Sequence, residues 1–279
     1  MTRHPLEMPD GDAVDLWLTG DPAGRRAVIL MHGLEGSLAS PYARHLLKAV
    51  AARGWCGVFL HARGSAAVPN RLQRGYHAAH WEDAAEAVAW LRARGATAVS
   101  AIGVSLGANQ LLVWLGRGDA CSLDRAVAIS PPFDLGACAG TFEHGFARIY
   151  GDHLLACMRR SLLAKAHLNG LTKAQLARFA TVRAMDDALT APLHGFAGVE
   201  DYYARASCAG HLAGITKPTL ILHAADDPLV PAATIPKDFP TAVTLRCSAR
   251  GGHVGSLAGW WPRQWLPGEA CGFIEEVDN

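Results

Sequence analysis

The chain alternates short apolar runs with longer segments in which apolar residues recur at helical spacing. The short runs predict strands at residues 13–18, 27–31, 54–60, 97–102, 125–129, 219–222 and 242–247. The longer segments predict helices at residues 41–53, with Ser40 as the N-cap, at residues 81–94, and from Leu106 toward Gly116. Alternation of this kind indicates an α/β fold, a mostly parallel sheet flanked by helices.

Strand-like runs are missing from residues 134–211, which we name the cap segment. Helical patterns occur within it at residues 153–167 and 172–181. Because ligands of open α/β sheets bind beyond the carboxyl ends of the strands, helices inserted there would wall a pocket. We therefore predict a single domain over residues 1–279 with the cap segment as a helical insertion. The alternative is an ordinary helical layer that buries the sheet.

The composition excludes some classes of function. Half of the 279 residues are hydrophobic and the formal net charge is +1, as in a soluble chain with one large core. Recognition of nucleic-acid phosphates normally leaves a strongly basic surface, so we expect no nucleic-acid partner.

The residues that follow Met1 lack the apolar core of a secretion signal. No apolar stretch approaches the length of a membrane span, so we expect no stable membrane insertion. Composition makes no prediction about oligomeric state.

The seven cysteines indicate reduced thiols. Their number is odd and no C-x-x-C pair occurs, which does not fit a disulfide framework. We therefore expect a cytoplasmic protein in which these side chains are small buried hydrophobic groups. They are Cys56, Cys121, Cys138, Cys157, Cys208, Cys247 and Cys271.

A serine lies between two glycines where a predicted strand meets a predicted helix. The motif is Gly103-Val104-Ser105-Leu106-Gly107, and its order of strand, tight turn and helix is that of a nucleophile elbow. Flanking glycines let the two backbones approach closely, which exposes the serine oxygen. Ser105 is therefore the candidate nucleophile, although the motif alone is weak evidence.

A serine nucleophile needs a histidine base and a carboxylate that orients the base. Two adjacent carboxylates, Asp226 and Asp227, follow the strand at residues 219–222. Asp227 stands at the Asp-x-x-Val-Pro position usual in these hydrolases and is preferred, although Asp-Pro is also ordinary turn chemistry. His253, between glycines after the last predicted strand, is the candidate base. On its own it would be one loop histidine among thirteen.

The tetrahedral intermediate of acyl transfer also needs hydrogen-bond donors for its oxyanion. Met31-His32-Gly33-Leu34-Glu35-Gly36-Ser37 ends an early strand at the place where this fold carries the first donor. The backbone N–H groups of Leu34 and Leu106 are the candidate pair. The alternative is an ordinary glycine-rich turn.

No metal or nucleotide cofactor is expected. His77, His80, Glu82 and Asp83 lie close together in the sequence but match no ligand spacing, and a polar helix start explains them more simply. No glycine-rich nucleotide motif or P-loop occurs.

A second pair of carboxylates lies in the cap segment. Asp186 and Asp187 are three to four residues after Arg183 and precede Tyr202-Tyr203. We expect them to anchor the cap segment through ion pairs and hydrogen bonds rather than to act in catalysis.

Taken together, these motifs resemble the YheT-like hydrolases of the α/β-hydrolase superfamily, which are related to eukaryotic abhydrolase-domain lipid hydrolases. The resemblance covers nearly the whole chain and implies a Ser–Asp–His triad, a helical cap and action on carboxylic esters, with lipid-like or short acyl chains usually suggested. The chain departs from the family pattern at Ala108, where glycine is common, and at residues 65–67, where a glycine-rich turn is usual. The matching segments are His32–Ser37, Pro69–Arg71, Tyr76–His77, Gly103–Gly107, Ser130–Phe133, Asp186–Asp187, His194–Phe196, Tyr202–Tyr203, Pro218–Ile221, Asp226–Pro228 and Gly251–Gly255.

The sequence therefore predicts a carboxylic ester hydrolase that forms an acyl-enzyme on Ser105. Its expected partner is a small-molecule or lipid-like ester with a short or medium acyl chain. A thioesterase or an acyltransferase would use the same triad and is the nearest alternative; a non-catalytic binding protein on the same fold has no need of all three triad residues. Apolar residues available for an acyl pocket, or equally for the core, are Phe142, Phe146, Leu154 and Leu155.

Overall fold

An eight-stranded sheet forms the centre of the protein. The computed structural model describes residues 1–66, 68–118, 122–255, 257–258 and 263–276. The strand order is β1-β2-β4-β3-β5-β6-β7-β8. The strands from β4 to β8 in this order are parallel to one another, whereas β2 runs antiparallel to both of its neighbours, β1 and β4. The strands are β1 Thr2–Glu7, β2 Ala13–Leu18, β3 Arg26–Met31, β4 Cys56–Leu60, β5 Ala98–Val104, β6 Ala126–Ile129, β7 Thr219–Ala224 and β8 Val243–Ser248, with a separate pair β9 Leu257–Ala258 and β10 Arg263–Gln264.

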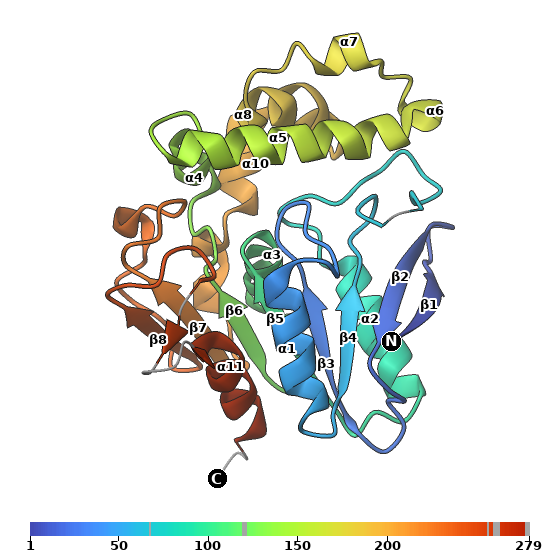
Figure 1. Ribbon diagram of the computed structural model, residues 1–279, viewed down its shortest axis with the longest axis vertical. Helices are drawn as coiled ribbons and strands as arrows, with labels where there is room; N and C mark the ends of the chain where they lie inside the picture. The colour runs from blue at the N-terminus through green and yellow to red at the C-terminus, as the bar shows by residue number, and fades with distance from the viewer. Residues whose placement is uncertain (67, 119–121, 256, 259–262, 277–279) are drawn as a thin grey trace.

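Helices cover both faces of the sheet. Side chains along a strand alternate between its faces, so in β3 Ala27, Ile29 and Met31 join the core on one face, while Val28 and Leu30 join the core on the other. Figure 1 shows α1 and α11 in front of the sheet and α2 and α3 behind it. These helices are α1 Pro41–Ala51, α2 Glu82–Ala93, α3 Leu106–Gly116 and α11 Trp265–Glu275. This three-layer arrangement confirms the predicted fold class.

The chain between β6 and β7 is helical and lies over the edge of the sheet to which the parallel strands point (Figure 1). Its helices have a hydrophobic cluster of their own, which includes Leu154, Leu155 and Met185. Its elements are α4 Leu135–Thr141, α5 Ala147–Ala164, α6 Ala166–Asn169, α7 Lys173–Leu176, α8 Val182–Met185, a π-helix Asp186–Thr190, α9 Ala191–Leu193, α10 Val199–Ala206 and a 3₁₀ helix Cys208–Gly214. A further 3₁₀ turn, Ala232–Thr234, follows β7.

Several elements differ from the sequence predictions. The helix expected over residues 172–181 is wrong apart from Lys173–Leu176, because only Leu176 of that turn is buried and nothing extends its apolar face. Ser40 occupies the N-cap position of α1, but its hydroxyl accepts the N–H of Ser37 instead of a helical N–H.

The elements that the sequence did not predict include β1 and α11. Strand β1 is an edge strand in which only Leu6 is buried, so it shows no apolar alternation. Helix α11 contains Pro267, Gly268 and Gly272, which obscure its helical periodicity.

Candidate active site

Ser105 lies on the turn between β5 and α3 with a backbone that few residues other than glycine adopt. Its φ is 52° and its ψ is −117°, a conformation that costs on the order of 1–3 kcal/mol and is found mainly at functional sites. Close packing explains both glycines of the motif. A Cβ on Gly103 would lie 2.6 Å from the Cα of Ala108, and one on Gly107 would lie 2.6 Å from the carbonyl oxygen of His32.

A continuous hydrogen-bond chain connects the three residues predicted to form the triad. The Nε2 atom of His253 lies 3.0 Å from Ser105 Oγ, and its Nδ1 atom lies 2.8 Å from Asp227 Oδ2. With a proton on Nδ1, the imidazole donates to the carboxylate and accepts from the serine hydroxyl. The structure thus brings together residues that follow β5, β7 and β8, three parallel strands of the same half of the sheet, with β6 between β5 and β7.

Asp227 is held as a buried carboxylate. Its Oδ1 atom accepts the N–H groups of Leu229 at 2.9 Å and Val230 at 3.3 Å. Burial raises the pKa of this carboxyl, but the hydrogen bond and charge of His253, with the Leu229 N–H, outweigh burial and hold the pKa below its usual value. Asp227 is therefore charged when it orients the imidazole.

The adjacent Asp226 has a different partner. Its Oδ1 atom accepts the N–H groups of Gly251 and Gly252, both at 2.8 Å. These glycines directly precede His253, so Asp226 holds the loop that presents the imidazole. The sequence indicated two neighbouring carboxylates but did not predict that Asp226 would hold the loop before His253.

The loop after β3 packs directly against Ser105. A Cβ on Gly33 would lie 3.2 Å from the Cβ of Ser105. The N–H of Gly33 donates to the Tyr42 hydroxyl at 3.1 Å, and that of Glu35 donates to the Tyr76 hydroxyl at 2.8 Å. Within the described chain, the N–H of Leu34 meets no acceptor.

Leu106 supplies the second free N–H group. It is the first residue of α3, so its N–H has no acceptor within the helix and points out of the helix N-terminus.

The buried His32 supports the loop after β3: its Nδ1 atom lies 2.7 Å from the Gly33 carbonyl oxygen and its Nε2 accepts the Ala62 N–H at 3.1 Å. Burial lowers the pKa of His32 to about 4, so the ring is neutral.

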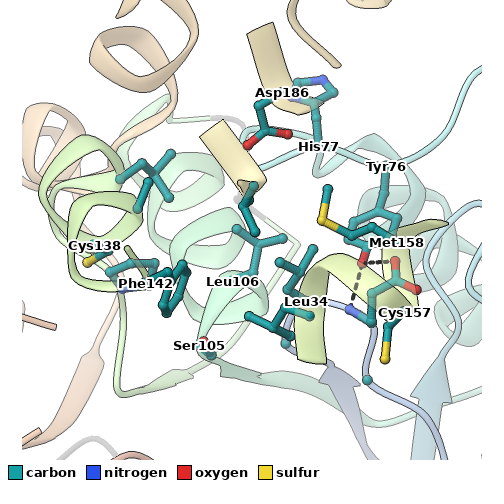
Figure 2. A pocket seen from close by; sticks show the side chains of 18 of the residues that line it. Leu34, Tyr76, His77, Ser105, Leu106, Cys138, Phe142, Cys157, Met158 and Asp186 are labelled. Atoms are coloured by element: carbon teal, nitrogen blue, oxygen red, sulfur yellow. Dashed lines mark hydrogen bonds between the residues drawn. The ribbon is translucent and has the colours of Figure 1, made fainter. Parts of the chain in front are cut away.

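A cavity of about 810 Å³ lies between the cap segment and the sheet, with Ser105 on its wall. Figure 2 shows Leu34, Leu106 and Phe142 around the serine, with His77 and Asp186 at the far end. Of the four residues suggested for an acyl pocket, Phe142, Phe146 and Leu154 line this cavity, whereas Leu155 is buried in the cluster of the cap segment.

Two histidines and a glutamate line another part of the cavity. The rings of His77 and His194 lie 4.4 Å apart between centroids. Burial, followed by the neighbouring histidines and cations, lowers the pKa of His194 to about 4 and that of His77 further. Glu35 also lines this side, and burial raises its pKa even though hydrogen bonds from Ser161 and Tyr76 lower it in part.

His80 and Asp83 join Arg63 in a buried network of polar side chains. His80 Nε2 lies 2.9 Å from Asp83 Oδ2, and Asp83 also accepts from Arg63 at 2.8 Å. In the described part of the chain no group of acidic, histidine and cysteine side chains has the arrangement of a metal site.

The second carboxylate pair forms hydrogen bonds in the cap segment, but its expected ion pair is absent. Asp186 accepts from Thr190 Oγ1 at 2.7 Å and from the Tyr203 hydroxyl at 2.8 Å, and Asp187 accepts the Val199 N–H at 2.9 Å. Arg183 pairs instead with Glu200. Burial raises the pKa of Asp186 to about 6.

Six of the cysteines are free, and Cys138 and Cys157 line the cavity. The seventh, Cys121, lies outside the described residues, as does Ala67 of the loop in which the chain departs from the family pattern. Ala108, the other departure, is fully buried in α3.

Comparison with known proteins defines the class. The family model described as "alpha/beta hydrolase fold" matches residues 26–254. The chain therefore belongs to the α/β-hydrolase family. Within that family the chain is 42% identical, over 94% of its length, to YheT of Escherichia coli (strain K12), and it covers 81% of that protein. The name of YheT assigns that protein provisionally to the esterases. The expected resemblance to the YheT-like group is confirmed.

Other relatives and solved structures agree with this class. The chain is 30% identical over 92% of its length to phospholipase ABHD3 of Mus musculus and 28% identical over 98% to monoacylglycerol lipase of Saccharomyces cerevisiae, and it spans 63% of each. The Pyrococcus furiosus esterase Pf2001 matches with a TM-score of 0.65 at 16% identity, over 98% of this chain and 91% of that one, which shows a shared fold. Within the described chain, no helix is long and apolar enough to cross a membrane.

Proposed function

We propose that the protein is a serine esterase that hydrolyses carboxylic esters through an acyl-enzyme on Ser105. The observation that carries this proposal is the hydrogen-bond chain Ser105–His253–Asp227 at the wall of a large cavity. His253 Nε2 would take the hydroxyl proton as Ser105 Oγ attacks the ester carbonyl carbon, and Asp227 would stabilise the resulting imidazolium.

The remaining steps use the same groups. The N–H groups of Leu34 and Leu106 would donate to the oxyanion, where their hydrogen bonds strengthen as charge develops. When the intermediate collapses, His253 returns the proton to the departing alcohol and the acyl group stays on Ser105. A water molecule then loses a proton to His253, attacks the acyl carbon, and releases the acid with the serine hydroxyl restored.

The cavity supports an ester with an apolar acyl group. Leu106, Leu135 and Phe142 lie on its wall with other apolar side chains, and its volume lies within the range of small-molecule sites. We propose short or medium acyl chains, including lipid-derived ones, which agrees with the lipases and phospholipases among the relatives. We also propose that the cap segment, residues 134–211, acts as the roof of this substrate site.

The proposal is tested with a fluorophosphonate probe and a series of p-nitrophenyl esters. The native protein is expected to bind one probe molecule and to cleave the esters, and Ser105→Ala is expected to do neither. A native protein that is not labelled, or a Ser105→Ala variant that cleaves esters at the native rate, would contradict it. Product analysis with added alcohol and with thioesters then separates hydrolysis from acyl transfer and thioester cleavage.

A further inference from the structure

Glu35 joins the loop after β3 to helix α5 of the cap segment. One carboxylate oxygen accepts the hydroxyl of Ser161 on α5 at 2.5 Å, and the other accepts the hydroxyl of Tyr76 at 3.1 Å. The Tyr76 oxygen in turn accepts the N–H of Glu35 itself at 2.8 Å. Figure 2 shows Tyr76 and its hydrogen bonds beside Cys157 and Met158 of α5.

The preceding residue, Leu34, also contacts the cap segment. Its side chain packs against the cluster formed by Leu154, Leu155, Leu176, Val182 and Met185. The loop that carries the candidate oxyanion donor is therefore held by the cap segment through an apolar contact at Leu34 and through a polar contact at Glu35.

The backbone of Glu35 needs such support. Its φ is 55°, in the left-handed region that costs a residue other than glycine about 1 kcal/mol or more. Three hydrogen bonds fix this conformation, and one of them occupies the N–H of Glu35. Among residues 33–36 of the described chain, this leaves the N–H of Leu34 as the donor without an acceptor. In the described chain Arg160 is the cation whose charge acts on the carboxylate.

We propose that Glu35 is a positioning residue through which helix α5 sets the place of the Leu34 N–H in the oxyanion site. The inference rests on the proposed esterase function. Contact of α5 with Glu35 holds the loop in its strained conformation, and loss of that contact lets the loop relax and moves the donor away from the oxyanion. The cap segment then affects the rate of acyl transfer as well as the shape of the pocket.

Four variants separate this role from a general structural one. Glu35→Gln replaces one acceptor oxygen with a donor, and Ser161→Ala removes the hydroxyl on α5. Ser161→Thr keeps the hydroxyl, and Asp152→Asn removes an exposed carboxylate from the same helix. One aliquot of each variant is labelled to completion with the fluorophosphonate probe to count the reactive serines. In an unlabelled aliquot, kcat and KM for one p-nitrophenyl ester are measured and expressed per reactive serine, so that misfolded protein is not counted.

The expected loss is in kcat. Displacement of a reacting group by about 1 Å can cost about 100-fold, so kcat is expected to fall about 10- to 100-fold in Glu35→Gln and about 5-fold or more in Ser161→Ala, with KM within about twofold. Ser161→Thr is expected to recover most of the native kcat, and Asp152→Asn to retain it.

Three results would overturn the proposal. One is a kcat in Ser161→Ala within twofold of the native value, another is a loss confined to KM, and the third is a Ser161→Thr variant as slow as Ser161→Ala. A native protein that neither binds the probe nor cleaves the ester overturns the esterase function itself, so the two failures are distinguishable.

Discussion

The two sides of the cavity are built by different means. The floor, formed by β5, the Ser105 turn and α3, is fixed by backbone contacts that only glycine permits at Gly103 and Gly107. The roof, the cap segment, is joined to the loops that follow β3 and β4 by side chains such as Glu35 and Lys165. The Lys165 ammonium donates to Asn70 Oδ1 and to two main-chain carbonyl oxygens at 2.8–2.9 Å.

This difference between backbone packing and side-chain contacts indicates which parts of the site tolerate substitution. Backbone contacts leave little room for change, because proteins are packed as densely as organic crystals. Side-chain contacts can be replaced singly and at lower cost. Changes to the floor should therefore abolish the chemistry, whereas changes to the roof should alter rate, substrate preference or the pH dependence of stability.

The largest effect is expected for Asp227→Asn. The amide cannot hold the imidazole with its proton on Nδ1 and its Nε2 free to accept, and in triads this change costs about 10⁴-fold in kcat. The measurement is kcat for a p-nitrophenyl ester. Asp226→Asn is the matched control and should cost less than about 10-fold, because the amide oxygen can still accept from Gly251 or Gly252. Equal losses in the two variants would contradict the assignment of Asp227.

Gly107→Ala should destabilise the floor of the cavity by steric overlap alone. The new Cβ would overlap the Met31 carbonyl oxygen and lie 2.6 Å from that of His32, and such overpacking costs about 3 kcal/mol of stability. Urea unfolding and probe labelling measure the two consequences. Gly140→Ala is the control, because Gly140 lies in α4 with no atom within 4 Å of its added Cβ. A Gly107→Ala variant as stable as the control would refute the packing argument.

Asp186→Asn tests a buried charge in the roof and should have the smallest effect. The raised pKa, about 6 against the ordinary 3.8, means that the folded protein holds this proton more tightly than the unfolded chain. The stability that this provides is full below about pH 4 and is lost as the pH rises through 6, with a cost of at most about 3 kcal/mol. Relative to native protein, Asp186→Asn should therefore gain stability as the pH rises from about 4 to about 7, and the gain should stay constant above that pH.

Thermal unfolding at several pH values measures this difference. Asp187→Asn, which removes the neighbouring exposed carboxylate, is the matched control for the loss of a carboxylate that is not buried. A difference for Asp186→Asn that does not change with pH would contradict the buried-charge account.

The floor was predictable from the sequence because local patterns encode it. Ser105, Asp227 and His253 each follow a run that predicts a strand, and parallel strands bring their carboxyl ends together. The spacing from Asp227 through Val230 to Pro231 also selected the carboxylate that the structure places against His253. Their catalytic roles stay a proposal.

The roof could not be predicted in the same way. The contacts of Glu35 join it to Tyr76 and Ser161, which are 41 and 126 residues away in the sequence, and no spacing rule links such positions. The expected helix over residues 172–181 was wrong for a related reason, since α7, the short helix that does form there, packs against the distant helix α5. Strand β1 depends likewise on its pairing with β2.

The central claim is that an acyl group is carried on Ser105, and peptide mass spectrometry of the acid-quenched protein tests it most directly. The protein is mixed with a p-nitrophenyl ester, quenched with acid within milliseconds, digested and mapped. The account predicts a mass increase of one acyl group on the peptide that contains Ser105, at a level that decays at the rate of turnover, and none in Ser105→Ala. Turnover with the acyl group on a different residue, or with no acyl group on the protein under conditions in which deacylation limits the rate, would contradict it.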